Sequence, residues 1–498
     1  MNPDSDSRPQ AGSRAPLVEA LVRHRQSEIL PLHVPAHKYG AGLPSLTQIF
    51  GEEVFRFDIN GMPGLDMHDA PTEVIAEAQA LAATLFNADS AFFLVNGTSS
   101  GLHAMVMSAV RPGESLLLPR SCHRAVFHAM ILADAIPRYI PDEIDSRFGI
   151  ARNISAAAVA EQLRRGVTPA ALLVTHPDIY GLPADLAGII ACARAAGVTT
   201  LADEAHGCLG YVHDRLPPGA MRLGADLSAM SVHKHGGSLT QSSLLLCRAG
   251  KIDPADVREA LNCIGTSSAS YLLMASLDAA RQQLADRGQE LAESVLELVG
   301  YLRSRVDSTG VMFTLGGAHD PANADADPTK LVINVRETGH SGYAVDDILR
   351  RRHGIQIELS DAYNIMPNFS WADTQETADR FYDALLDVTR KAPAVQAPSA
   401  VALPDIPRMA VSPRAAFFSK KKSVSLDSAV GQISGEMLMA FPPGIPFLCP
   451  GEILTREVID HALRLRTEPG CLMTGMADPT LNTIRVLAGG GSRREDFR

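Results

Sequence analysis

Paired cysteines, long apolar runs and basic clusters are all scarce in this chain of 498 residues. The seven cysteines include no C-x-x-C pair, and such an odd, scattered set does not describe a disulfide framework or a structural zinc site. We therefore expect no metal site, and we expect a reducing compartment, the cytoplasm.

Membrane and nucleic-acid partners are also not expected. The longest uncharged run, Ser90 to Val110, is interrupted by small polar residues from Asn96 to Gly101. The polar stretch from Met1 to Pro16 lacks the apolar centre of a signal peptide and is expected to be disordered. The net charge is −11 and no cluster of lysines or arginines is larger than Lys420 to Lys422, which argues against nucleic-acid binding and suits a small cationic substrate.

Strand and helix signals alternate along most of the chain. Strands are predicted at residues 91–95, 115–118, 170–175, 197–202, 225–232 and 242–247, and helices at 17–28, 74–85, 102–110, 186–196 and 272–306. This alternation predicts an α/β fold with a mainly parallel sheet and helices on both faces.

The pattern also predicts a domain organisation. Residues 1–60 form an N-terminal arm, 61–315 a large domain and 316–392 a small α/β domain with strands at 329–336 and 354–359. Residues 393–413 lie in an Ala- and Pro-rich linker, and 414–498 form a C-terminal domain. Within this last domain, Phe441 to Glu452 is too rich in proline for a helix or a central strand.

The segments from Leu201 to Gly207 and from Ser231 to His235 carry the most distinctive chemistry. Asp203 ends one apolar run and Lys234 follows the next, so both are expected near strand ends, where open α/β sheets bind ligands. A carboxylate facing a pyridine nitrogen and an amine able to form a Schiff base are what pyridoxal 5'-phosphate (PLP) requires of a protein. Each residue alone fits a helix cap or a surface charge, so the PLP prediction depends on both occurring together.

Two further segments fit the same cofactor. Asn96 to Gly101 is interpreted as a tight turn that opens a helix, where backbone N–H groups and small hydroxyls form a cradle for phosphate. His123 lies near the start of the helix that follows Pro119 to Arg124, where an imidazole can stack on a flat ring. A plain turn and a capping histidine are the alternatives.

With these residues identified, the sequence resembles the Orn/Lys/Arg decarboxylase family of PLP enzymes, in particular its shorter bacterial members. The resemblance extends over residues 17 to 480 and is carried by His33 to Gly42, Leu65 to Ala82, Phe92 to Gly101, Pro119 to Arg124, Asp203 to Gly207, Ser231 to Gln241, Thr266 to Asp278 and Pro442 to Glu452. It implies a large domain of fold type I, like that of aspartate aminotransferase, with smaller α/β C-terminal domains. It also implies a homodimer or higher homo-oligomer with sites at the subunit interface.

The resemblance assigns roles by position. It implies that Lys234 is the catalytic Schiff-base lysine and that Asp203 pairs with the pyridinium nitrogen. It implies that His123 stacks on the ring, that His206 lies beside the cofactor, and that both take part in catalysis. The implied phosphate ligands are Thr98, Ser99, Ser231 and His233, with Ser267 or one of its hydroxyl neighbours reaching the phosphate of the other subunit.

The activity implied is α-decarboxylation of a basic L-amino acid (arginine, lysine or ornithine) to its amine and CO2. The candidates for pairing with the cationic end of the substrate are Glu436, Glu358 and Asp361. Glu436 and the Pro-Gly-Ile-Pro segment are also similar to the family's C-terminal stretch near the substrate.

Two departures from the family pattern keep other reactions open. His235-Gly236-Gly237 follows the lysine where the family usually has Leu or Thr-Leu, and the match around Asp361 to Trp371 is loose. The alternative is an aminotransferase, an oxidase or a cyclase that acts on an arginine-like amino acid. A catalytically silent relative would require the loss of cofactor residues, and Asp203, Lys234 and His123 are all present.

Overall fold

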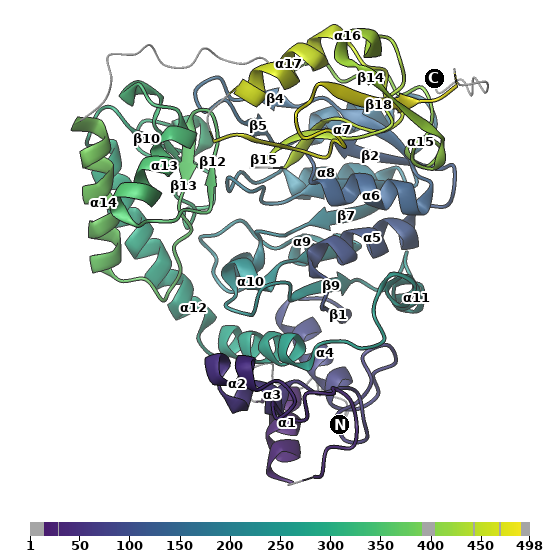
Figure 1. The fold of residues 1–498 in the computed structure, drawn as a ribbon, viewed down its shortest axis with the longest axis vertical. Coiled ribbons are helices and arrows are strands. Elements are labelled where there is room, and N and C mark those ends of the chain that lie inside the picture. Colours follow the sequence, from purple (N-terminus) through teal and green to yellow (C-terminus); the bar gives the residue numbers. More distant parts are fainter. Residues whose placement is uncertain (1–13, 28, 391–403, 442–443, 468–469, 490–498) are drawn as a thin grey trace, which may run out of the picture. The chain divides into compact units, whose positions relative to one another are not determined.

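The computed structural model describes residues 14–27, 29–390, 404–441, 444–467 and 470–489 (Figure 1). The chain divides into two compact units, the first made of Met1–Ser108 and Thr200–Ala292 and the second of Ala109–Thr199 and Glu293–Arg498. Of the N-terminal stretch expected to be disordered, residues 1–13 lie outside the described residues, as do residues 393–403 of the predicted linker. The domain boundaries predicted above remain a proposal.

The first unit contains a mixed run of strands in the order β1-β9-β8-β7. β9 is antiparallel to both β1 and β8, whereas β7 and β8 are parallel. The elements of this unit are α1 (Pro16–Gln26), α2 (Pro44–Phe50), α3 (Glu52–Phe57), α4 (Val74–Leu85), β1 (Ser90–Leu94), α5 (Gly97–Ala109), β7 (Thr199–Asp203), the 3-10 helix η1 (Cys208–Tyr211), α9 (Ala220–Leu223), β8 (Leu227–Met230), α10 (Val232–His235), β9 (Ser243–Cys247), α11 (Pro254–Ile264) and α12 (Tyr271–Asp307).

The second unit contains a parallel run of strands in the order β6-β2-β3. Its first elements are β2 (Ser115–Pro119), α6 (Arg124–Ala133), β3 (Ile136–Ile140), β4 (Glu143–Ile144), β5 (Ala151–Arg152), α7 (Ala156–Leu163), β6 (Ala171–Thr175) and α8 (Leu186–Ala195). β2 and β6 are almost continuously apolar and buried, as expected for strands with both faces covered, whereas β3 is mostly half-buried.

A four-stranded antiparallel sheet, β10-β11-β13-β12, follows in the same unit and has a core of its own. Its elements are β10 (Phe313–Thr314), η2 (Pro321–Asn323), β11 (Ile333–Asn334), η3 (Arg336–Thr338), α13 (Gly342–His353), β12 (Leu359–Ser360), β13 (Asn364–Met366) and α14 (Gln375–Arg390). Apolar side chains of α13 and α14 pack against these strands, so this part is a small α/β layer.

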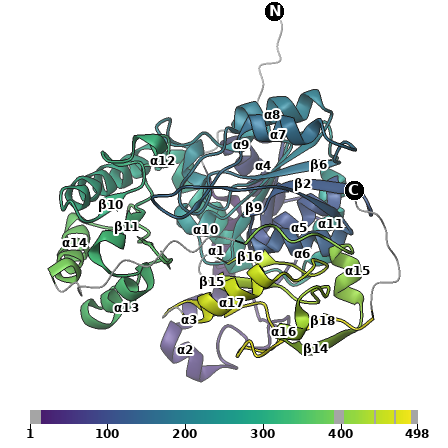
Figure 2. The same ribbon diagram turned by 90° about the horizontal axis from the view of Figure 1, so that it is seen from above.

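The C-terminal segment, described from residue 404 to residue 489 with gaps, contains two small sheets, β14-β18 and β16-β15-β17. Its elements are α15 (Pro413–Phe418), β14 (Lys421–Ser425), α16 (Leu426–Ala429), β15 (Leu438–Phe441), β16 (Ile445–Leu448), α17 (Arg456–Thr467), β17 (Leu472–Thr474) and β18 (Thr483–Leu487). α15 lies beside α6 (Figures 1 and 2), where the Arg414 guanidinium donates to the carbonyls of Ile131 and Leu132, both at 3.0 Å.

The structure confirms most of the predicted elements and corrects some boundaries. Helix 74–85 is found as predicted, whereas α5 begins at Gly97 rather than at residue 102, so the predicted tight turn is the start of the helix itself. β8 ends at Met230, because Val232 already begins α10. The strands predicted at 329–336 and 354–359 are only the short β11 and β12. β16 is an edge strand, which agrees with the proline content of this stretch.

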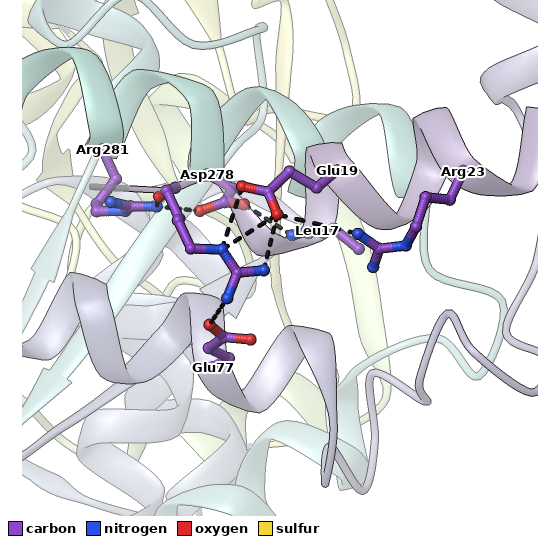
Figure 3. Close-up of polar contacts among 7 residues, drawn as sticks. Leu17, Glu19, Arg23, Glu77, Asp278 and Arg281 are labelled. Atoms are coloured by element: carbon purple, nitrogen blue, oxygen red, sulfur yellow. Dashed lines mark hydrogen bonds and ion pairs between the residues drawn. The ribbon is translucent and has the colours of Figure 1, made fainter. Parts of the chain in front are cut away.

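The N-terminal helix α1 is capped by a residue distant in sequence. No side chain of its own caps α1; instead Oδ2 of Asp278, on α12, accepts the backbone N–H of Leu17 at 2.9 Å. Asp278 is paired with Arg281, and both side chains are at most 1% exposed. The Arg281 guanidinium also donates to the carbonyl of Arg14, at 2.6 Å. Figure 3 shows Asp278 lying between Arg281 and the start of α1.

Replacing Asp278 should loosen this arm. D278A removes the cap of α1 and leaves the Arg281 charge buried without its carboxylate, and breaking a buried pair in this way costs about 3–5 kcal/mol. Denaturant unfolding should therefore show a lower free energy of unfolding, with faster hydrogen exchange in α1. E290Q is the matched control on the same helix, since Glu290 is exposed, and it should change the free energy by less than about 0.5 kcal/mol. Equal effects of the two variants would contradict this role of Asp278.

Candidate active site

The parallel strands β7 and β8 end beside one another in the first unit. Asp203, the last residue of β7, is paired in register with Ala229 of β8. Because parallel neighbours share the edge at which they end, Asp203 and the residues that follow β8 lie at the same edge. Lys234, on α10, is close enough for its charge to lower the pKa of Asp203. The structure thus brings together the two residues on which the PLP prediction depends.

Asp203 is a buried acid with one oxygen left open. Its side chain is only 2% exposed, and burial raises its pKa against the opposing effects of the Ala205 N–H and the Lys234 charge. Within the described residues, the single hydrogen bond to this carboxylate comes from the Ala205 N–H to Oδ1, at 3.1 Å. No hydrogen bond to Oδ2 from the described residues accompanies it.

The neighbouring Glu204 is also a buried acid, but the protein supplies several hydrogen-bond donors to its carboxylate. Its carboxylate is 0% exposed and accepts the Tyr211 hydroxyl at 2.6 Å, the Ala220 N–H at 2.7 Å and the Ser228 hydroxyl. Burial nevertheless raises its pKa to about 7. These donors hold Glu204 within the fold, whereas Asp203 receives a single hydrogen bond from the described residues.

Lys234 lies next to an imidazole. Its Nζ is 3.0 Å from Nε2 of His206, and the ring of His206 lies 5.5 Å from that of His235 between centroids. Lys234 is half-buried and His206 is buried. An amine and an imidazole at hydrogen-bond distance can exchange a proton, so this pair is suited to acid–base chemistry.

Three hydroxyls meet at the start of α5. Thr98 Oγ1 is 2.5 Å from Ser231 Oγ and donates to Ser243 Oγ at 2.9 Å, and all three side chains are buried. Gly97 has φ of +71° where the chain turns from β1 into α5. A Cβ on Gly101 would lie 2.9–3.0 Å from side chains of Leu94 and Ala229, so glycine allows α5 to pack closely on the strands.

The remaining predicted phosphate ligands are less enclosed. Ser99 is half-buried in the first turn of α5. The half-buried His233 has Nδ1 at 2.9 Å from the carbonyl of Ser242, which makes Nδ1 the donor of this ring. Ser267 is exposed on the loop between α11 and α12, so its predicted contact with another subunit remains a prediction.

His123 belongs to the second unit and caps a helix, as one of the two interpretations predicts. Its Nδ1 accepts the backbone N–H of Ala125 at 3.2 Å, at the N-terminus of α6. The side chain is exposed. Capping uses only one ring nitrogen in the ring plane, so it does not exclude stacking, and the stacking role stays a prediction.

The three acids suggested for the substrate differ in surroundings. Glu436 is buried, accepts the N–H groups of Ala477 and Arg485 at 3.0 Å, and lines a cavity of about 110 Å³. Asp361 accepts four hydrogen bonds or more, including the Tyr180 hydroxyl at 3.0 Å, and Glu358 is exposed. Among the described residues, no three His, Cys, Asp or Glu side chains gather as a metal-ligand set.

Comparison with known proteins now decides the family. The chain matches the profile of the Orn/Lys/Arg decarboxylase major domain over residues 15–318 and that of the C-terminal domain over residues 398–468. The chain belongs to the Orn/Lys/Arg decarboxylase family.

Relatives and solved structures agree with this membership. The chain is 39% identical to the arginine decarboxylase of Bacillus subtilis (95% of this chain, 97% of that protein) and 38% identical to that of Halalkalibacterium halodurans (95% and 98%). The structure of the Francisella novicida lysine decarboxylase superimposes with a TM-score of 0.83 at 21% identity, covering 95% of this chain and 81% of that one. The predicted α/β fold is therefore confirmed.

The residues at this edge fit the group that this decarboxylase family implies. An open oxygen on the buried Asp203 suits a protonated ring nitrogen, and the Lys234 amine suits an aldehyde. The hydroxyls of Thr98 and Ser231, beside the N-terminal N–H groups of α5, suit a phosphate.

Sequence reasoning missed the residues that support this site. The role of Glu204 was missed because its partners Tyr211, Ala220 and Ser228 lie 7, 16 and 24 positions further along the chain, and only the fold brings them to its carboxylate. Ser243 was missed because its contact with Thr98 joins residues 145 positions apart. The pairing of β1 with β9 was the signal that would have found it, because Ser243 lies opposite Leu94.

Replacing Glu204 should change how stability depends on pH. Because its pKa rises from 4.5 to about 7 on folding, folding binds a proton between these values, and the contribution of this carboxyl to stability declines as the pH rises through that window. E204Q removes this titration, so the free energy of unfolding of the native protein minus that of E204Q should fall between pH 4.5 and 7 and stay constant above. Denaturant unfolding at several pH values measures this difference.

Glu457 provides a control for which the free energy of unfolding should change with pH in the opposite direction. The pKa of Glu457, a fully exposed carboxyl, is lowered by its own backbone N–H and by the Thr455 hydroxyl. The corresponding difference for E457Q should therefore rise with pH at the acid end of the range. A difference for E204Q that stays constant from pH 4.5 to 7 would contradict the raised pKa.

Proposed function

We propose that this family member is a PLP-dependent decarboxylase whose substrate is L-arginine, which it converts to the amine and CO2. Decarboxylation of a basic amino acid is the activity of the family to which the chain belongs. Arginine is preferred over lysine because the relatives at 36–39% identity are named arginine decarboxylases, whereas those named lysine decarboxylases are at 23–25%. The observation that carries the PLP assignment is the open, buried carboxylate of Asp203 beside Lys234 and His206.

The cofactor supplies, when bound, a ring that delocalises the electron pair left on Cα after CO2 departs. Asp203 holds a proton on the ring nitrogen through Oδ2. Lys234 Nζ would hold the aldehyde carbon and, once released as the ammonium, would donate to Cα the proton that takes the place of the departed CO2. His206 Nε2, 3.0 Å from that amine, exchanges the proton with it.

The remaining predicted residues are assigned to binding. Thr98, Ser99, Ser231 and His233 hold the phosphate, and Ser267 reaches the phosphate of a second subunit in a homodimer or higher homo-oligomer. His123 stacks on the ring. Glu436 is the acid that we assign to the guanidinium of the substrate, because it lines a cavity and belongs to the C-terminal stretch that the resemblance places near the substrate.

The site of action proposed is the cytoplasm. All seven cysteines are free thiols, which suits a reducing compartment. None of the helices in the described part of the chain combines the length and apolar composition needed to cross a bilayer.

The first test combines an absorbance spectrum with product analysis. The purified protein should show the visible-edge band of PLP bound to an amine, and addition of arginine should release CO2 and one amine in equal amounts, with lysine and ornithine used less well. K234A should lose both the band and the activity. K251A, at a lysine in the loop that follows β9, is the matched control and should keep both. A native protein without the band would overturn the proposal.

A second candidate reaction is favoured by one contact, that of His235 with His206. An imidazole at this place gives the site an additional base, which an oxidase, aminotransferase or cyclase acting on an arginine-like amino acid would use. H235L separates the two. For a decarboxylase, H235L lowers the rate and leaves the products unchanged, without uptake of oxygen or keto acid. Oxygen or keto-acid consumption, or a cyclised product formed without CO2, that the native protein shows and H235L abolishes would instead establish the second candidate.

A further inference from the structure

A buried ion pair joins the loop before α6 to the C-terminal segment, within the second unit. The loop runs from Arg120, directly after β2, to His123. The Arg120 guanidinium donates to Glu452 through two bonds, Nη1 to Oε1 at 2.8 Å and Nη2 to Oε2 at 3.1 Å. The side chains are 8% and 0% exposed. Glu452 also accepts the backbone N–H of Cys449, at 2.7 Å.

This pair contributes more to the orientation of the two side chains than to the free energy of unfolding. The guanidinium lies over the rings of Tyr139 and Phe127, with its central carbon 4.8 and 5.4 Å from their centroids. Burying two charges costs free energy that their attraction only balances, so such a pair contributes little net stability. What a two-pronged arginine–carboxylate contact does provide is a fixed orientation.

Every residue of the loop before His123 is held in place. The Arg120 N–H donates to the carbonyl of Ile140 at 3.3 Å, the Ser121 hydroxyl donates to Asp142 Oδ1 at 2.8 Å, and Cys122 is fully buried. His123 then caps α6, and its side chain alone in this loop is both aromatic and exposed. The direction of this ring therefore depends on the three residues before it.

We propose that Arg120 and Glu452 are positioning residues, through which the C-terminal segment holds the loop that presents His123 to the cofactor. The identity of that cofactor rests on the proposed function. Without the carboxylate of Glu452, Arg120 is a buried charge lacking its partner and must move toward water, and the loop backbone moves with it. The ring of His123 then loses its defined orientation, although His123 itself is unchanged.

The test compares E452Q, E452D and R120K with the native protein by two measurements. Hydrogen exchange of peptides covering residues 119–127 measures how firmly the loop is held in place, and it requires no cofactor. Titration with PLP, together with kcat and KM for arginine, reports its consequence. In metal sites the loss of a supporting partner costs about 10- to 100-fold in affinity or activity, and we expect E452Q to bind PLP about tenfold more weakly.

The variants should follow the geometry of the pair. E452Q and R120K, which break the two-pronged contact, should speed exchange in the loop more than in peptides of β14 and β18. E452D keeps the charge and should lie nearer the native protein. The double variant R120K/E452Q should be no worse than the more severe single variant, because the two residues act as one unit. D427N is the matched control, since it breaks the exposed pair of Asp427 and Arg456 in the same C-terminal segment, and it should change neither measurement.

The outcomes separate the two proposals. Native protein that does not bind PLP overturns the proposed function, while the exchange measurement still decides whether the pair positions the loop. Unchanged exchange at residues 119–127 in E452Q and R120K overturns the positioning role. Equal acceleration in all peptides, with a lower melting temperature and unchanged PLP affinity, also overturns it, because the pair would then act on stability alone.

Discussion

The parallel pairing of β7 with β8 is the constraint on which the candidate active site depends. Its register places Asp203 opposite Ala229, so β7 ends just before β8 does. Both chains then leave the sheet at the same edge, which brings Asp203 and Lys234 into electrostatic contact. An antiparallel arrangement of the same two strands would place the residues that follow them at opposite edges. The parallel direction of β7 and β8 therefore determines which residues meet at this edge, and the side chains of those residues then determine its chemistry.

The number of hydrogen-bond donors around each carboxylate distinguishes the buried acids of this protein from one another. A carboxylate removed from water needs donors in its place, and Glu204, Asp278 and Glu452 each receive several from the protein itself. Asp203 receives one within the described residues, although it is almost as deeply buried. A buried carboxylate with few donors from the protein, at the edge where α/β sheets bind ligands, is the feature that supports the proposed binding site.

Local pattern was sufficient for much of the fold and for the central residues of the site. The run that ends at Asp203 and the apolar periodicity from Val74 to Leu85 depend on neighbours in sequence, and the structure contains both elements. His123 at the start of a helix was equally local. The start of α5 was misplaced because glycine and serine are typical of turns, whereas tertiary packing around Gly101 extends the helix through them.

Contacts between distant residues could not be predicted in this way. Arg120 and Glu452 are 332 positions apart, and Leu17 and Asp278 are 261 apart. From the sequence alone, Arg120 cannot be distinguished from a surface charge, and Glu452 cannot be distinguished from an ordinary residue of a Pro-Gly turn. The neighbouring residues do not show whether either side chain is buried. Only the fold shows that each charge is enclosed and which residue of opposite charge it pairs with.

Because these contacts join residues far apart in the sequence, the position of one segment depends on the position of a distant one. A charge can be buried only when its partner arrives, because the cost of burying it alone exceeds what the surrounding apolar contacts return. β2 pairs with β3 and β6, which lie between residues 109 and 199, whereas the loop that carries Arg120 is also bonded to Cys449 and Glu452. The orientation of His123 thus depends on a segment more than three hundred residues further along the chain, and the C-terminal segment is part of the structure that defines the loop rather than an addition to it.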